Sequence, residues 1–381
     1  MNEPKRTWAE VDLGAIRHNY EQMRERAGAG VKFLGVVKAD AYGHGALPVA
    51  AMLQRIGADY LAVACLDEAE ALRKGGITLP VLILGVTDPK YTDELIRLDI
   101  TAAVADEGSA VEMSRIAESM GRKAKVHLKV DTGMGRIGFI CRGGRDPAEQ
   151  LARIADLPGL DAEGIFTHFA VSDMPGEGDG YTEEQYEAFR ALVQRVEEAR
   201  GKRFGIRHCA NSGAMTGHPD KFLDMVRPGI ALYGCYPSEL TGGLDLRPAM
   251  SVRTRIVQIR ELLPGDSVSY GRRYIAEKPI RAAVVPIGYA DGLHRVLSGK
   301  IDMLVRGRRA PQIGRICMDM CMLDVTDIPE ACAGDVVTLF GTDGDACIPV
   351  EEQAEKAGTI SYELLCAMSP RVERIWLPDQ T

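Results

Sequence analysis

The 381-residue sequence lacks the features that would direct it to a membrane, a nucleic acid or a secretory route. It contains no run of roughly 18 apolar residues, so no membrane-spanning helix is expected. Lysine and arginine form no long cluster and the formal net charge is −8, which argues against nucleic acid or an anionic membrane as a partner. The opening MNEPKRTWAEVDL lacks the apolar core of a signal peptide, so we expect a cytoplasmic protein.

The nine cysteines do not form the pattern of a disulfide framework. Their number is odd and their spacing irregular, so they are expected to be reduced thiols. Cys317 and Cys321 are the closest pair, but no second pair or histidine completes a zinc site, and no metal is expected. A content of 46% hydrophobic and 26% charged residues fits a globular enzyme for small molecules.

Short apolar runs alternate with amphipathic stretches over the first two thirds of the chain. This alternation is typical of parallel βαβ units, and eight of them in roughly 220 residues match a (β/α)8 TIM-type barrel. An open doubly wound sheet is the rival, but KADAYGHG after the first strand lacks the dinucleotide-binding glycine spacing. The predicted strands are 33–38, 60–64, 81–84, 101–104, 126–130, 164–168, 204–209 and 230–233, with helices at 68–74, 91–98, 108–120, 147–155 and 183–200.

The pattern changes near residue 245. The runs SVRTRIVQI, IRAAVVPIG, DMLVRG, MLDVT and DVVTLF are alternating or β-branched and are separated by short turns, which indicates a mainly-β domain. A single helix is expected near 350–357. We therefore predict an α/β fold with an N-terminal (β/α)8 barrel at 1–245 and a C-terminal mainly-β domain at 246–381. The alternating TWAEVDL suggests that the first dozen or so residues could pair with the second domain.

Residues at the C-terminal ends of barrel strands are the candidates for catalysis. Lys38 ends the first predicted strand after mainly apolar residues, where burial disfavours the ammonium and makes a nucleophilic amine available. Such a lysine suits a Schiff base with pyridoxal 5'-phosphate. A lone lysine at a strand end is nevertheless more often simply exposed to solvent.

Two loops after the seventh and eighth strands could bind the phosphate of that cofactor. Asn211 and Ser212 are both candidates for binding the cofactor. Ser212 begins a short helix whose first amides and hydroxyl could hold an anion, although a plain helix cap is an equal alternative. Gly229 and Ile230 follow a proline, and a glycine lets backbone amides approach an anion closely. Barrels often bind phosphate at these two loops.

Two further residues could contact the cofactor ring. His208 could stack on a planar heterocycle or be a hydrogen-bonded core histidine. Arg227 could donate to a ring nitrogen, although a surface ion pair is the more common role of an arginine. Because an arginine keeps its proton, the ring nitrogen would stay unprotonated and the ring would be a weaker electron sink. A weaker sink suits a racemase.

Nine segments, in order along almost the whole chain, resemble those of the alanine racemases. They are VVKADAYGHG (36–45), KVDTGMGRIGF (129–139), THFAVSD (167–173), HCANSGA (208–214), VRPGIALYG (226–234), VSYGRRY (268–274), PIGYADG (286–292), GRICMDMCMLDVTD (314–327) and ISYEL (360–364). The resemblance implies a pyridoxal phosphate-dependent isomerase of fold type III. It also implies a homodimer with shared active sites that supplies D-alanine for the peptidoglycan of the cell wall.

The resemblance further implies a two-base mechanism through a pyridoxal phosphate aldimine. Lys38 would hold the cofactor and act as the base on one face of the substrate, and the partner subunit's Tyr270 would act on the opposite face. Tyr270 would need cationic neighbours to react as a phenolate. The candidates are His168 and Arg227, or Arg272 and Arg273.

Other roles are carried over from the same resemblance. Arg227 would meet the pyridine nitrogen with His208 nearby, Arg136 would contact the phenolic oxygen, and His168 would bridge toward Tyr270 and Arg227. Tyr42, Ser212, Gly229, Ile230 and Tyr362 would bind the phosphate. Met318, Asp319 and Tyr289 would come from the partner subunit, line the entrance and bind the substrate carboxylate together with Arg136.

Two positions have special features. Lys129 resembles a lysine that is carbamylated in many members of the family and then positions Arg136. Asp40 stands where many members have asparagine; either residue can form a turn, so little disturbance of Lys38 is expected.

Three alternative functions stay open from the sequence alone. A decarboxylase of the ornithine or diaminopimelate type would have a carboxylate near the pyridine nitrogen, which Arg227 and VSYGRRY speak against. A racemase of broader scope, acting on serine or basic amino acids, cannot be distinguished by sequence. A non-catalytic pyridoxal phosphate carrier would resemble the barrel alone and leave the β domain unexplained.

Overall fold

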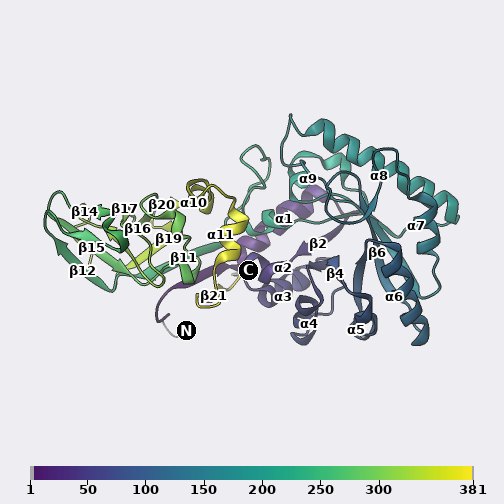
Figure 1. Ribbon diagram of the computed structural model, residues 1–381, viewed down its shortest axis with the longest axis horizontal. Helices are drawn as coiled ribbons and strands as arrows, with labels where there is room; N and C mark the ends of the chain where they lie inside the picture. Colours follow the sequence, from purple (N-terminus) through teal and green to yellow (C-terminus); the bar gives the residue numbers. More distant parts are fainter. Residues whose placement is uncertain (1–3, 380–381) are drawn as a thin grey trace. The chain divides into compact units, whose positions relative to one another are not determined.

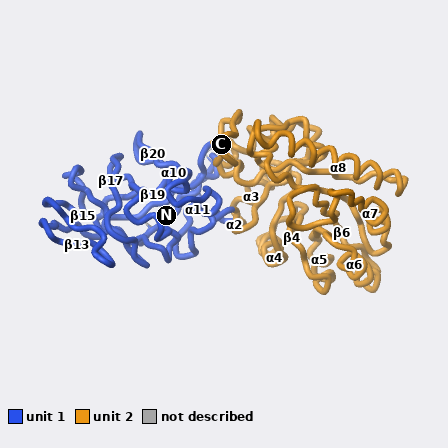
Figure 2. Tube along the Cα trace, turned by 45° about the horizontal axis from the view of Figure 1, so that its top comes forward, with its two compact units in different colours: residues 1–15, 42–45, 247–381 blue, residues 16–41, 46–246 orange. Residues whose placement is uncertain are grey.

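The computed structural model describes residues 4–379, which divide into two compact units (Figure 2). We call residues 16–41 and 46–246 the barrel unit, and residues 1–15, 42–45 and 247–381 the β unit. The short segment 42–45 therefore belongs to the β unit, although it follows Lys38 closely in sequence.

Eight parallel strands of the barrel unit follow one another in the order β10-β2-β3-β4-β5-β6-β8-β9. Figure 1 labels β2, β4 and β6 among them. Every residue of β3 and β5 is buried, as expected for strands covered on both faces. Asp224 N donates to Arg207 O and Arg227 N to Ala210 O, both at 3.0 Å, so the segments around β9 and β10 nearly close the barrel. The strands are β2 (Lys32–Val36), β3 (Tyr60–Val63), β4 (Val81–Val86), β5 (Ile100–Val104), β6 (Ala124–Asp131), β8 (Leu160–Phe166), β9 (Ile206–His208) and β10 (Met225–Val226), with β7 (Phe139–Ile140) beside β6.

Helices alternate with the strands, and in the longer helices the buried residues recur at helical spacing. In α8, the buried residues Tyr186, Phe189, Val193 and Val196 recur at helical spacing, and the helix ends at Gly201 with φ 62°. All five predicted helices are present, with bounds shifted by a few residues. The helices are α1 (Leu13–Ala27), α2 (Lys38–Tyr42), α3 (Ala46–Ile56), α4 (Leu66–Lys74), α5 (Thr92–Arg97), α6 (Glu107–Ser119), α7 (Ala148–Ala155), α8 (Asp179–Arg200) and α9 (Ser212–Gly217).

The strand predicted at 230–233 is wrong. Ile230–Tyr233 form a 3-10 helix, and the eighth strand is the two-residue β10, which pairs with β2 through Met225 and Val226. All four residues of this 3-10 helix are buried. Such a short apolar run shows no period that separates a strand from a helical turn.

The β unit contains one long sheet in the order β12-β15-β18-β17-β16-β19-β11-β1-β21. Its β1 (Trp8–Asp12), the alternating segment at the chain start, lies between β11 and β21. Helix α10 (Val350–Ala357) lies at the predicted position, but α11 (Ser361–Ala367) was not predicted. The other strands are β11 (Met250–Arg255), β12 (Gln258–Leu262), β13 (Ser267–Val268), β14 (Tyr274–Ile275), β15 (Ile280–Val285), β16 (Asp302–Val305), β17 (Arg308–Ile313), β18 (Cys321–Asp324), β19 (Val336–Asp343), β20 (Ala346–Ile348) and β21 (Glu373–Leu377).

The predicted fold class, a (β/α)8 barrel with a C-terminal mainly-β domain, is confirmed. Within residues 4–379, no helix is long and apolar enough to cross a membrane.

Candidate active site

Lys38 lies just after β2 and begins a turn with an unusual backbone. The next three residues, Ala39, Asp40 and Ala41, have φ between 52° and 54° and ψ between 47° and 50°. This left-handed helical conformation costs a non-glycine residue roughly 1–2 kcal/mol. Strain of this kind clusters at functional sites, where the surrounding structure enforces it.

Asp40 stabilises this turn from within the barrel unit. Its Oδ1 accepts a 2.7 Å hydrogen bond from the amide of Ala46, the first residue of α3. An asparagine side chain has an oxygen that could accept the same bond, and both residues tolerate left-handed backbone. The expectation that Asp40 disturbs Lys38 little is consistent with this geometry.

Basic side chains from several strand ends meet in the barrel unit. Burial, together with the charges of Arg227, Arg136, Lys129 and Lys38, lowers the pKa of His168 well below its usual value. His168 is therefore neutral near pH 7. A neutral His168 would not be a cationic neighbour of Tyr270, which leaves Arg227 as the charged candidate of the barrel unit.

Arg227 is a buried cation held by neutral groups. One terminal nitrogen donates to Thr167 O and Cys209 O, both at 2.9 Å, and lies 3.3 Å from His168 Nδ1. The other terminal nitrogen lies 2.8 Å from His208 Nδ1. Burial lowers the pKa of Arg227 to about 10, which leaves it protonated at neutral pH. Among the described residues, none of its hydrogen-bond partners is a carboxylate, an unusual state for a buried charge.

The His208 ring is completely enclosed. It is 0% exposed and stacks on Phe166 with ring centroids 4.8 Å apart and an interplanar angle of 6°. A ring this enclosed has no free face for a cofactor, so the stacking role expected for His208 is not supported. Its link to the site runs through Arg227.

The two loops predicted to bind phosphate are in contact. The amide of Gly229 donates to Ser212 Oγ at 2.8 Å, and Ile230 begins the adjacent 3-10 helix. Ser212 is not a helix cap, because the cap of α9 is Asn211, whose Oδ1 accepts from Ala214 N at 3.0 Å. Asn211 therefore shapes the loop.

The β unit carries the remaining candidate residues. Tyr270 is 68% exposed and, with Met318 and Asp319, lines a cavity of about 440 Å³. Elsewhere in this unit the rings of Tyr42 and Tyr362 lie 6.0 Å apart.

Comparison with known proteins decides the family. Residues 11–237 match the family model "Alanine racemase, N-terminal domain" and residues 249–376 match "Alanine racemase, C-terminal domain". The chain belongs to the alanine racemase family. It is 46% identical over 379 residues to "Alanine racemase 2" of Caldanaerobacter subterraneus subsp. tengcongensis, covering 99% of this chain and 96% of that protein. It is also 46% identical over 371 residues to alanine racemase of Desulfovibrio desulfuricans, covering 97% and 98%.

Solved structures agree with this assignment. Alanine racemase of Clostridium difficile superposes with a TM-score of 0.92 at 39% identity, covering 99% of this chain and 96% of that one. That of Bacillus anthracis, solved with bound L-Ala-P, gives 0.91 at 35% identity, covering 100% and 97%. The expected family is confirmed, and the protein is a racemase and so an isomerase. Because both family models match, the carrier that resembles the barrel alone is excluded.

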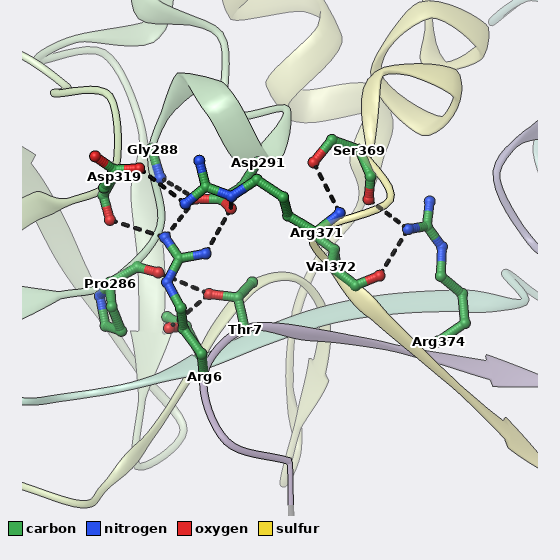
Figure 3. A network of polar contacts seen from close by, with 11 residues as sticks. Arg6, Thr7, Pro286, Gly288, Asp291, Asp319, Ser369, Arg371, Val372 and Arg374 are labelled. Atoms are coloured by element: carbon green, nitrogen blue, oxygen red, sulfur yellow. Dashed lines mark hydrogen bonds and ion pairs between the residues drawn. The ribbon is translucent and has the colours of Figure 1, made fainter.

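A network of ion pairs, which the sequence did not suggest, lies in the β unit of this racemase (Figure 3). The carboxylate of Asp291 is completely buried and accepts from both terminal nitrogens of Arg6, at 2.6 and 2.8 Å. Arg6 also donates to Asp319 O at 3.0 Å, and Arg371 donates to Asp319 Oδ1 at 2.8 Å. The network thus joins the turn containing Tyr289 to the segment containing Asp319.

Breaking this network should destabilise the β unit. In Asp291→Asn the bidentate ion pair is lost and the guanidinium of Arg6 is left without its buried counter-charge. We expect a loss of about 2 kcal/mol in the free energy of unfolding, seen as a lower urea midpoint. Asp88→Asn breaks an exposed ion pair with Lys90 and should leave the midpoint unchanged. Equal midpoints for Asp291→Asn and the parent would contradict the role of the network.

Proposed function

We propose that this racemase interconverts L-alanine and D-alanine with pyridoxal 5'-phosphate held in the barrel unit, and that the D-alanine is used for peptidoglycan. The observation that carries the proposal is Arg227, a buried and protonated guanidinium with no carboxylate among its partners in the described chain. Such a donor suits a neutral ring nitrogen. It does not suit a decarboxylase, which would place a carboxylate there.

The residues present fit the cofactor. Lys38 would hold it covalently, Arg227 would donate to the pyridine nitrogen and Arg136 to the phenolic oxygen. Pyridoxal phosphate supplies, when bound, an electron-withdrawing ring that acidifies the α-proton of alanine. The joined loops of Ser212 and Gly229 support a phosphate site, because the bond from the Gly229 amide to Ser212 Oγ holds the two candidate loops against each other. The other proposed phosphate ligands are Tyr42, Ile230 and Tyr362.

Inversion at the α-carbon requires a proton to leave one face and another to arrive on the opposite face. We assign these transfers to Lys38 Nζ and to the phenolic oxygen of the partner subunit's Tyr270. The positive charge of Arg227 would favour the phenolate, because His168 is neutral. His168 would accept from Arg227 and bridge toward Tyr270.

A homodimer with shared sites is part of the proposal. Tyr270, Met318, Met320 and Tyr289 are 68%, 52%, 47% and 42% exposed, which is high for large apolar side chains on one unit. A partner subunit would cover them. In that arrangement Tyr289, Met318 and Asp319 would line the entrance and bind the substrate carboxylate with Arg136.

Lys129 should be carbamylated. It is 2% exposed, and burial followed by the charges of Arg227 and Arg136 lowers its pKa to about 7. Its neutral amine can attack CO2, forming an N–C bond and releasing one proton, and the resulting negative charge would position Arg136. Because only the deprotonated amine reacts, we expect the carbamate signal in ¹³C NMR with labelled CO2 to rise as pH increases through about 7.

Lys221 is the matched control for this experiment. It is 4% exposed, but its ion pairs with Asp220 and Glu183 outweigh burial and raise its pKa. It should therefore stay protonated and unlabelled over the same range. The absence of a carbamate signal from Lys129 at every pH would contradict the assignment.

The activity and its breadth can be tested together. The purified protein loaded with cofactor should show a visible band that borohydride removes, and it should form D-alanine from L-alanine, detected with a D-amino-acid oxidase. Parallel incubations with L-serine and L-lysine measure substrate scope. A bacterium that requires D-alanine should grow without it when supplied with this gene. A cofactor-loaded protein that forms no D-alanine would refute the proposal.

We also propose that the enzyme works in the cytoplasm. All nine cysteines lie in the described part of the chain and none of them forms a disulfide. Reduced thiols are typical of that compartment. A fusion reporter active only in the cytoplasm would test this.

A further inference from the structure

A line of polar side chains runs through the interior of the barrel unit behind Arg227. A terminal nitrogen of Arg227 lies 2.8 Å from His208 Nδ1, and His208 Nε2 lies 2.8 Å from His127 Nδ1. His127 Nε2 in turn lies 3.3 Å from Glu163 Oε1, an ion-pair distance. Thr101 donates to the same carboxylate oxygen at 3.0 Å. Both histidines are 0% exposed and Arg227 is 3% exposed.

Arg227 at one end of this line and Glu163 at the other determine which ring nitrogens of the two histidines carry a proton. A guanidinium can only donate, so His208 Nδ1 must accept and the proton of the neutral ring is on Nε2. His208 is neutral because burial and the charge of Arg227 lower its pKa well below the usual value. His208 Nε2 then donates to His127 Nδ1, which leaves the proton of His127 on Nε2. That nitrogen lies at ion-pair distance from Glu163 Oε1 but outside hydrogen-bond geometry.

The local fold makes room for this line. The pairing of β6 with β8 shifts register at this point, because Val126 pairs with Ala162 whereas His127 pairs with Gly164. Glu163 is the extra residue of a β-bulge, and bulges redirect side chains next to active sites. A Cβ atom on Gly164 would lie 2.6 Å from the His127 ring, so only glycine leaves space for it.

This arrangement is unusual for a barrel interior, which is normally filled by branched apolar side chains. Burying polar rings costs free energy unless their hydrogen bonds are satisfied. Glu163 stays ionised although burial raises its pKa, because the contacts with His127 and Thr101 outweigh burial and lower it overall. A carboxylate is thus kept at the end of the line.

We propose that Glu163 and His127 are positioning residues which act through His208 to fix the orientation and donor pattern of Arg227 toward the ring nitrogen of the cofactor. The inference rests on the proposed role of Arg227. With Glu163 ionised, each imidazole has one permitted tautomer and His208 Nδ1 is always an acceptor. In the parent, the donating guanidinium of Arg227 and the accepting carboxylate of Glu163 impose the same proton order from the two ends. A glutamine at position 163 can also donate to His127 Nε2, which opposes the donation from Arg227 to His208, so two tautomer patterns compete.

The first test uses protein without cofactor and does not depend on activity. With ¹⁵N-labelled histidine, the parent should show His208 as the Nε2–H tautomer, and Glu163→Gln should give a mixture of tautomers for His127 and His208. Asp161→Asn is the matched control, because it removes an exposed carboxylate from the same strand and should leave both signals unchanged. Identical histidine signals in Glu163→Gln and the parent would overturn the inference.

The second test uses the loaded enzyme. We expect Glu163→Gln to lower kcat about tenfold with little change in KM and to shift the cofactor absorption band, and Glu163→Asp to restore part of the loss. An unshifted band with unchanged kcat would overturn the inference. A different result would refute the proposed function. That result is a parent enzyme that binds no cofactor or forms no D-alanine, and it does not depend on the histidine tautomers.

Discussion

Lys38→Ala is expected to remove the borohydride-sensitive absorption band and to reduce racemisation by about 10,000-fold or more. The substitution deletes both the covalent attachment of the cofactor and one of the two bases. Non-covalent binding should survive in part, because Ser212, Gly229 and Arg227 are untouched. Equilibrium dialysis of the cofactor, together with the absorption spectrum and the rate of D-alanine formation, measures the three effects separately.

Controls keep this prediction specific. Lys90→Ala removes a lysine that lies 64% exposed on the surface and should leave band and rate unchanged. Lys38→Arg keeps the positive charge but cannot bind the cofactor covalently, so it should be as inactive as Lys38→Ala. A variant at position 38 that retained the reducible band would show that another amine holds the cofactor.

The position of Lys38 could be predicted because the information is local. An apolar run that ends in lysine is sufficient to place Lys38 at the end of the first barrel strand, and its proposed role rests on the other segments that resemble the family. The same holds for Ser212, which follows the seventh strand. Gly229 follows the eighth strand only in the structure, because the sequence placed that strand at 230–233. The left-handed turn after Lys38 could not be predicted, because alanine has no intrinsic preference for that backbone and the fold must impose it.

The residues that sequence reasoning missed depend on long-range register. Glu163 faces His127 only because one extra residue is inserted into the β6–β8 pairing. Arg6 meets Asp291 across 285 residues of sequence. Neither relation leaves a local pattern. In the fold, β10 was missed for a similar reason, since two residues become a strand only by pairing with β2.

Tyr270→Phe should abolish proton removal from one antipode of alanine while leaving removal from the other. The two enantiomers have equal free energies in water, so kcat/KM must fall equally in both directions and cannot reveal which base was lost. The informative measurement is exchange of the α-proton with deuterated solvent. We expect exchange from one antipode to fall by about 100- to 10,000-fold, and exchange from the other, served by Lys38, to persist.

A second tyrosine of the same motif provides the control. Tyr274 packs against a buried cluster of the β unit, so Tyr274→Phe should preserve both exchange reactions. Retention of both exchanges in Tyr270→Phe would disprove the two-base assignment. Loss of both would indicate that the hydroxyl is needed before any proton moves.

Mixing two inactive variants tests whether the bases come from different subunits. If each site combines Lys38 of one subunit with Tyr270 of the other, a mixed dimer of Lys38→Ala and Tyr270→Phe subunits has one doubly damaged site and one intact site. Random reassociation makes half of the dimers mixed, so about a quarter of the parental activity should return. If both bases came from the same subunit, every site would carry one defect and no activity would return. The exposed position of Tyr270 on the β unit favours the first outcome.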